Sequence, residues 1–194
     1  MIDAQTVAKL REMTGAGMMD AKKALEEVGG DLEKAAEELR KKGVVKAAKK
    51  SDRATGEGRV HAYIHATGKV GVLVEVLCET DFVARNENFI AFCNNLAMHI
   101  AAADPLYLTR ADVPEAVVMK EKELVIAGLK EEGKPEEMIA KISEGKMEKW
   151  YGEVVLMEQL FIKDEEKTIH ELLTEQIATI GENMQIRRFA RFAI

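Results

Sequence analysis

The chain has 194 residues, room for one ordinary domain or two small ones, and 28 basic against 34 acidic residues give it a net charge of −6. Hydrophobic residues make up 47% and aromatic residues only 5%. This composition excludes a disordered polymer, a collagen-like chain and a disulfide scaffold. Its acidic balance is atypical of proteins that bind nucleic acid, so nucleic acid is not an expected partner.

Cellular location is inferred from what the sequence lacks. No apolar stretch approaches the roughly 18 residues of a membrane span, so no membrane partner is expected. The first residues show neither the basic nor the apolar region of a secretion signal. Two cysteines are too few for a disulfide framework and indicate reduced thiols. We therefore expect a cytoplasmic protein.

Three short helices are predicted in an N-terminal domain at residues 1–45. Asp3 caps the first, the second runs from about Met18 to Val28, and the third follows the cap Asp31 and ends near Gly43. About 45 residues in three tightly turned helices form a small bundle with a limited core. Such a bundle is more typical of an interaction head than of an enzyme.

A basic linker is predicted at residues 46–58. Residues 40–53 include seven basic residues and one acidic residue, Asp52. Apolar periodicity is lost after Val45, and the segment ends in Thr55-Gly56-Glu57-Gly58, which is typical of a loop. We expect a domain boundary here.

Residues 59–194 predict an α+β core with a small antiparallel sheet and flanking helices. Residues 59–65 and 70–78 flank the turn segment Ala66-Thr67-Gly68-Lys69 and predict a hairpin. Further helices are expected near 115–131, 135–151 and 168–180, before a strand from Met184 to Phe192. A helix with one buried face is predicted from the spacing of Phe89, Cys93, Leu96, Ala97 and Ile100.

The strand at 70–78 is apolar on both faces. Alternate residues from Val70 to Cys78 form one face, which must be core. The other face carries Gly71, Leu73, Glu75 and Leu77, and is too apolar for open water. We expect a helix, a further strand or another subunit to cover it.

The sequence shows no recognisable catalytic or metal-binding motif. None of the four histidines has zinc-like spacing with a cysteine, and the glycine-rich phosphate-binding motifs are missing. Both cysteines fall at core positions, where thiols are inert. The carboxylates are scattered along helices, as on a solvated face. We expect neither an enzyme nor a bound cofactor or metal.

Two places could contact a partner. In the second helix, Met18 shares the core face with Ala21 and Leu25, whereas Met19 points to solvent. A single exposed methionine is ordinary in itself, although methionine is frequent at binding surfaces.

The second place is residues 78–85, where a strand ends and a helix begins after Thr80 or Asp81 as cap. Phe82 precedes Phe89 by seven residues, so one continuous helix would bury both. Alternatively, Phe82 is an exposed aromatic anchor for a partner's pocket. Spacing does not decide between these two readings.

Several segments resemble the bacterial translation elongation factor Ts family. The first two are LREMTGAGMMD at 10–20 and CETDFVAR at 78–85. Further similar segments, in the family's order, are 96–101, 132–135, 180–183 and 186–189. One departure is Leu160, where the family usually has proline.

The resemblance implies a guanine-nucleotide exchange factor for elongation factor Tu. It implies that the N-terminal bundle is ubiquitin-associated-like and rests on the partner's nucleotide domain. Phe82 would act as a wedge near the partner's Mg²⁺, and both Mg²⁺ and nucleotide would belong to the partner, not to this chain. The residues matched to partner contacts are Met18 and Met19 in the bundle and Thr80, Asp81, Phe82 and Val83 after the strand.

The chain also resembles the family's short form, without the second core subdomain and helical hairpin of longer members. Two chains could then supply two subdomains by pairing their sheets, so a homodimer is predicted, with Leu73 and Leu77 in the contact. The alternative function is a helical module without exchange activity. It would bind a ubiquitin-like protein or RNA with the help of the basic residues in 40–53, called here the basic segment.

Overall fold

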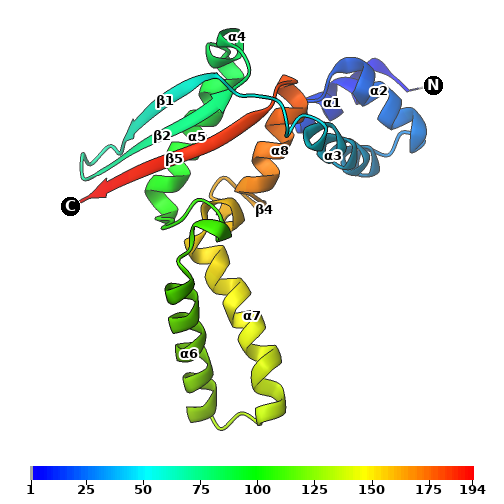
Figure 1. Cartoon of the computed structure of the whole chain (residues 1–194). Helices are drawn as coiled ribbons and strands as arrows, with labels where there is room; N and C mark the ends of the chain where they lie inside the picture. The colour runs from blue at the N-terminus through cyan, green and yellow to red at the C-terminus, as the bar shows by residue number, and fades with distance from the viewer. Residues whose placement is uncertain (1) are drawn as a thin grey trace. The chain divides into compact units, whose positions relative to one another are not determined.

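The computed structural model describes residues 2–194 and combines helices with a small antiparallel sheet, which confirms the predicted α+β class (Figure 1). In chain order the elements are α1 (Ala4–Thr14), α2 (Met18–Glu27), α3 (Leu32–Ala48), β1 (Glu57–Ile64), β2 (Val70–Cys78), α4 (Asp81–Ala84), α5 (Glu87–Ala103), η1 (Arg110–Asp112), α6 (Glu115–Glu131), α7 (Glu136–Val154), η2 (Leu156–Glu158), β3 (Leu160–Phe161), β4 (Asp164–Thr168), α8 (Ile169–Ile180) and β5 (Met184–Ala193). No helix among residues 2–194 has the length and apolar character needed to cross a membrane.

Residue contacts divide the chain into two compact units that interleave along the sequence. The first unit consists of the chain up to Arg59, Val76–Phe92 and Glu171–Gln185. The second consists of Val60–Glu75, Cys93–His170 and Ile186–Ile194. The predicted division into an N-terminal domain, a linker and a core follows the chain in order, and it stays a prediction.

The three predicted N-terminal helices are present as α1, α2 and α3. The Asp3 carboxylate accepts a 2.7 Å hydrogen bond from the backbone N–H of Thr6, and Asp31 caps α3 in the same way. The apolar faces of the helices meet in a small core formed by Val7, Leu10, Ala21, Ala24, Leu25 and Ala35. Small side chains let the short helices approach closely. The N-terminal bundle, called here the head, is therefore stabilised by few large buried side chains.

The third helix is longer than predicted. We expected it to end near Gly43, yet α3 continues to Ala48, so residues 46–48 of the predicted linker are helical. A Cβ atom at Gly43 would lie 3.4 Å from the Cβ of Ala178 on α8. Glycine here allows close packing of α3 against α8 and is not a stop signal. The helix continues because tertiary packing outweighs glycine's low helix propensity.

The predicted hairpin is β1 and β2, and β5 completes the sheet in the order β1–β2–β5. Along β2, Val72, Val74, Val76 and Cys78 are buried, as the alternation predicts. A Cβ at Gly71 would lie only 2.9 Å from Cδ1 of Ile64. The missing side chain therefore leaves room for Ile64 to lie across the strand.

The helix predicted after the hairpin is α5, and its expected buried residues are confirmed: Phe89, Cys93, Leu96, Ala97 and Ile100 are all fully buried. Hydrogen bonds join it to the strands within the second unit. Asn94 Oδ1 lies 3.3 Å from Nε2 of His61, and Nε of Arg191 donates to the Ala101 carbonyl at 3.2 Å. The first contact holds β1 beside the helix, and the second holds β5 there.

A short second sheet pairs β3 with β4 and was not predicted. Leu160, at the position where the family usually has proline, pairs with Thr168 in antiparallel register. Two residues are too few for a periodic signal in the sequence. Leucine lacks the backbone restriction of proline, so Leu160 is compatible with this strand pairing.

The helices predicted near 115–131 and 135–151 are α6 and α7, and they pack against each other as a helical hairpin (Figure 1). Gly133 has a positive φ of 70° in the connection, and Pro135 precedes α7. The expectation that the chain lacks a helical hairpin is therefore wrong. Both helices are evident in the sequence, and the four-residue connection between them, residues 132–135, brings them into antiparallel contact.

Candidate functional site: an exposed corner between strand and helix

The corner, defined here as residues 79–84, joins β2 to a single helical turn. β2 ends at Cys78 and α4 spans Asp81–Ala84. Thr80 has an extended backbone, and its Oγ1 accepts a 3.4 Å hydrogen bond from the N–H of Val83. Of the two predicted caps, Thr80 is the one used.

Phe82 is 81% exposed, whereas Phe89 is fully buried. The two residues do not share a helix, because α4 ends at Ala84 and α5 begins at Glu87. Asn86 makes the break: its Oδ1 accepts a 2.8 Å hydrogen bond from the N–H of Asn88. The reading that one continuous helix buries Phe82 is therefore wrong, and the aromatic ring faces solvent.

The carboxylate of Glu182, in the turn between α8 and β5, holds the start of the corner. Its Oε2 accepts hydrogen bonds from the backbone N–H groups of Glu79 at 3.1 Å and Thr80 at 3.0 Å. Its Oε1 accepts from the Thr80 hydroxyl at 2.6 Å. Three donors on two consecutive residues thus converge on one carboxylate. Sequence reasoning missed this role, although residues 180–183 were among the similar segments.

The neighbouring Asn183 is only 2% exposed and ties three parts of the first unit together. Its backbone N–H donates to Oε1 of Glu79 at 2.6 Å. Its side-chain amide donates to the carbonyls of Ser51 at 3.1 Å and Arg53 at 2.8 Å. The end of the basic segment is therefore fixed beside the corner.

Charged groups around the corner are paired. Arg53 Nη1 lies 3.4 Å from Oε1 of Glu79, and Arg85 Nη2 lies 2.7 Å from Oδ2 of Asp81. The Cys78 thiol donates to the Thr80 carbonyl at 3.2 Å. Burial, with a smaller contribution from the charge of Glu182, raises the pKa of Cys78 to about 11. This thiol is protonated at neutral pH and is structural, not a nucleophile.

The structure corrects one prediction for the two methionines at the start of α2. Met18 is 61% and Met19 63% exposed. The periodicity placed Met18 on the core face with Ala21 and Leu25, and only the latter two are buried. Met18 is the first residue of α2, so its side chain extends beyond the small core. Both methionines are therefore available to a partner, and neither stabilises the bundle by burial.

Acidic groups of the first unit pair with several side chains of the basic segment. Lys46 Nζ lies 2.7 Å from Oδ2 of Asp20, and Arg40 pairs with Glu171. Lys50 donates to the Ile177 carbonyl at 3.3 Å, and burial lowers its pKa. Basic side chains that are engaged within the protein are less available to bind phosphate groups. These contacts therefore do not favour the alternative in which the basic segment binds RNA.

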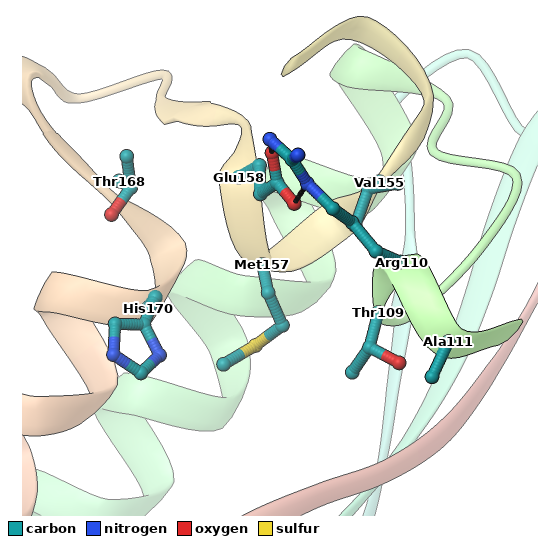
Figure 2. Close-up of a pocket in the computed structure, with 8 residues that line it drawn as sticks. All are labelled: Thr109, Arg110, Ala111, Val155, Met157, Glu158, Thr168 and His170. Carbon is teal, nitrogen blue, oxygen red and sulfur yellow. Dashed lines mark hydrogen bonds and ion pairs between the residues drawn. The ribbon is translucent and has the colours of Figure 1, made fainter. Parts of the chain in front are cut away.

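A shallow pocket of about 600 Å³ lies in the second unit, at the base of the helical hairpin (Figure 2). Arg110, which lines the pocket together with Glu158, pairs with both Glu148 and Glu158 and lies 4.3 Å above the Tyr151 ring. The guanidinium is thus already engaged by protein groups. Among residues 2–194, no group of three or more histidine, cysteine or acidic side chains is arranged to hold a metal ion.

The second unit also exposes apolar side chains on its strands. Leu73 is 46% exposed, and Val60 and Ile64 on β1 are more so. Phe192 is exposed on β5. The strand face that seemed too apolar for water is therefore open within the chain. Several exposed apolar side chains on neighbouring strands are compatible with an interface.

Comparisons with known proteins give one consistent answer. The family model described as "Elongation factor TS" matches residues 2–176. The chain is 58% identical over 193 residues to "Elongation factor Ts" of Geobacter sulfurreducens, covering 100% of this chain and 89% of that protein. The proteins of the same name from Geobacter metallireducens and an Anaeromyxobacter species are 57% and 58% identical, each over 100% of this chain, covering 89% and 88% of those proteins.

Proposed function

Because the chain belongs to the elongation factor Ts family, we propose that it acts in translation as a guanine-nucleotide exchange factor for elongation factor Tu. The observation that carries this proposal is the 81% exposure of Phe82 on a corner whose backbone is held by Glu182. A large aromatic ring gains little by facing water. On a rigid corner it is well suited to enter a partner's pocket.

The proposed contact segment is Thr80, Asp81, Phe82 and Val83. Phe82 is the wedge that displaces partner side chains near the bound Mg²⁺. The other three residues form the turn that holds Phe82 toward the partner. Mg²⁺ and nucleotide belong to the partner, so this chain supplies binding energy and no covalent chemistry. A factor that binds the nucleotide-free partner more tightly than the GDP-bound one must weaken GDP binding by the same ratio. The protein therefore acts by binding, not as an enzyme.

Met18 and Met19 provide the second proposed contact, from a ubiquitin-associated-like head. Both side chains are exposed at the first turn of α2. Methionine side chains are flexible and polarizable, so they fit varied apolar surfaces. Contact here anchors the partner while Phe82 disturbs the Mg²⁺ site. We place this activity in the cytoplasm, where translation takes place.

We further propose that two chains pair through the open face of the sheet. Leu73, Val60 and Ile64 expose apolar surface there. Sheets that pack face to face bury such residues between them. A homodimer would cover the face that the single chain leaves in solvent.

The test is release of a fluorescent GDP analogue from elongation factor Tu, with and without this protein. The wild type is expected to accelerate release, and Phe82→Ala to reduce the acceleration about tenfold or more, as for loss of an interface hot spot. Leu124→Ala, which shortens an exposed side chain on α6, is the matched control and should leave the rate unchanged. No acceleration by the wild type would refute the proposed function.

A further inference from the structure

The turn at Glu182 and Asn183 lies about 100 residues beyond the corner in sequence, yet it makes the contacts that fix the corner's backbone. We propose that Glu182 is a positioning residue for exchange: its carboxylate holds Thr80 so that Phe82 stands in the orientation that enters the partner. This inference rests on the proposed function. It adds a residue outside the segment matched to partner contacts.

The hydrogen bonds form a continuous chain from the carboxylate to the helical turn. The Thr80 hydroxyl donates to Glu182 at 2.6 Å and accepts from the N–H of Val83 at 3.4 Å. A hydroxyl that donates to a charged acceptor becomes a better acceptor itself. The carboxylate therefore sets the rotamer of Thr80 and, through it, the start of the turn that carries Phe82.

The same carboxylate also fixes the backbone before the turn. The N–H groups of Glu79 and Thr80 both point to Oε2, at 3.1 and 3.0 Å. Successive strand residues normally direct their N–H groups to opposite sides. Convergence of the two on one atom therefore requires a bend, and this bend turns the chain out of β2. Hydrogen bonds to a charged acceptor are stronger than neutral ones, so the bend is held firmly.

Phe82 has few contacts of its own to hold it in place, since its ring is 81% exposed. Its position is consequently set by the backbone of α4, a helix of four residues that is too short to be stable alone. Burial of Ala84 fixes one end of this turn. Glu182 fixes the other, so removal of its charge should let the wedge move without removing it.

The test uses the full chain with Glu182→Gln, which keeps the side-chain size but replaces one acceptor oxygen by an N–H donor. The maximal rate of GDP release from elongation factor Tu should fall about tenfold, as for loss of a charge-assisted hydrogen bond. The protein concentration giving half the maximal rate should change little, because Met18 and Met19 still bind. Glu123→Gln, on the exposed face of α6, should behave as the wild type.

A double variant separates positioning from a general structural effect. If Glu182 acts through Phe82, the variant carrying both Glu182→Gln and Phe82→Ala should be no slower than Phe82→Ala alone. Multiplied losses in the double variant, or a wild-type maximal rate for Glu182→Gln, would overturn the inference. If Glu182→Gln does not fold, Glu182→Asp retracts the charge by one methylene and is read by the same criteria.

A second readout does not depend on the partner. In the free protein, the backbone amide of Thr80 should exchange its hydrogen faster in Glu182→Gln than in the wild type, while the amide of Leu25 in the N-terminal core is unaffected. Unchanged protection of the Thr80 amide would refute the inference that Glu182 holds Thr80 in place. If the wild type fails to accelerate GDP release while the Thr80 amide exchanges faster in the variant, the proposed function is refuted, but the structural role of Glu182 is not.

Discussion

The Thr80 hydroxyl donates a 2.6 Å hydrogen bond to Oε1 of Glu182, across 102 residues of sequence. This contact joins the exposed corner to the turn before the last strand. It also explains why a short helical turn carrying a solvent-exposed phenylalanine keeps a defined start.

Thr80→Val should destabilise the protein by about 1 kcal/mol, because it removes both the cap of α4 and the donor to Glu182. Thr80→Ser keeps the hydroxyl and should remain within a few tenths of a kcal/mol of the wild type. Urea unfolding followed by circular dichroism measures both. Equal stability of the valine and serine variants would show that the hydroxyl contributes nothing.

Leu25→Ala should cost about 2–5 kcal/mol in the free energy of unfolding, since Leu25 is fully buried in the small head core. Met19→Ala changes a side chain on the same helix that is 63% exposed, and its cost should be below about 0.5 kcal/mol. Urea unfolding of the two variants checks this contrast. A comparable loss in Met19→Ala would mean that Met19 supports the fold and is not a contact surface.

Stability should decrease as the pH falls below about 6.5, because of His99. Burial lowers the pKa of this histidine, although its hydrogen bond to Gln159 opposes the shift. His99 Nδ1 accepts the N–H of Ile162 at 3.4 Å, and Nε2 lies 2.9 Å from Oε1 of Gln159, so the neutral ring fits its neighbours. In this pH range the unfolded chain binds a proton that the folded chain does not, which favours unfolding.

The measurement is the free energy of unfolding in urea between pH 7 and pH 5. His99→Gln retains a donor toward Gln159 without a titrating ring, and should show a smaller loss over this range. His65→Gln, at an exposed position of the hairpin turn, is the control and should keep the wild-type dependence. An undiminished loss in His99→Gln would assign the pH dependence to other groups.

The proposed homodimer predicts that Leu73→Lys yields a monomer, because a charge would be buried between two sheets. Sedimentation velocity at micromolar concentration should give a dimer for the wild type. Leu124→Lys alters an exposed leucine on α6, outside the strand face, and should leave the dimer intact. A monomeric wild type would contradict the proposal.

Periodicity in the sequence identified most of the helices, the hairpin and the buried face of α5. These are local properties, since apolar side chains recur at the spacing of the element that buries them. Asp3 and Asp31 were identified as caps for the same reason, because a cap bonds within its own turn. The two-residue strand β3 carried no such period and was missed.

Positions at the ends of elements could not be decided in this way. Met18 has the spacing of a core residue, yet its side chain is exposed at the first residue of α2. Gly43 looks like a helix stop, but α3 continues through it and packs closely against α8, where a Cβ would lie 3.4 Å from that of Ala178. The packing that carries α3 past Gly43 comes from α8, which is distant in sequence. The exposure of Met18 likewise depends on which segments pack against α2, and local spacing does not show this.

The sequence alone therefore determined the α+β class, the positions of most elements and the segments that resemble one family. Only the tertiary structure decided that Phe82 is exposed, that Glu182 and Asn183 hold its corner, and that one sheet face is open. The physical reason is that secondary structure follows local spacing, whereas exposure depends on which surfaces remain covered once distant segments have packed. The residue that positions the proposed wedge lies about 100 positions away from it, and no local pattern connects the two.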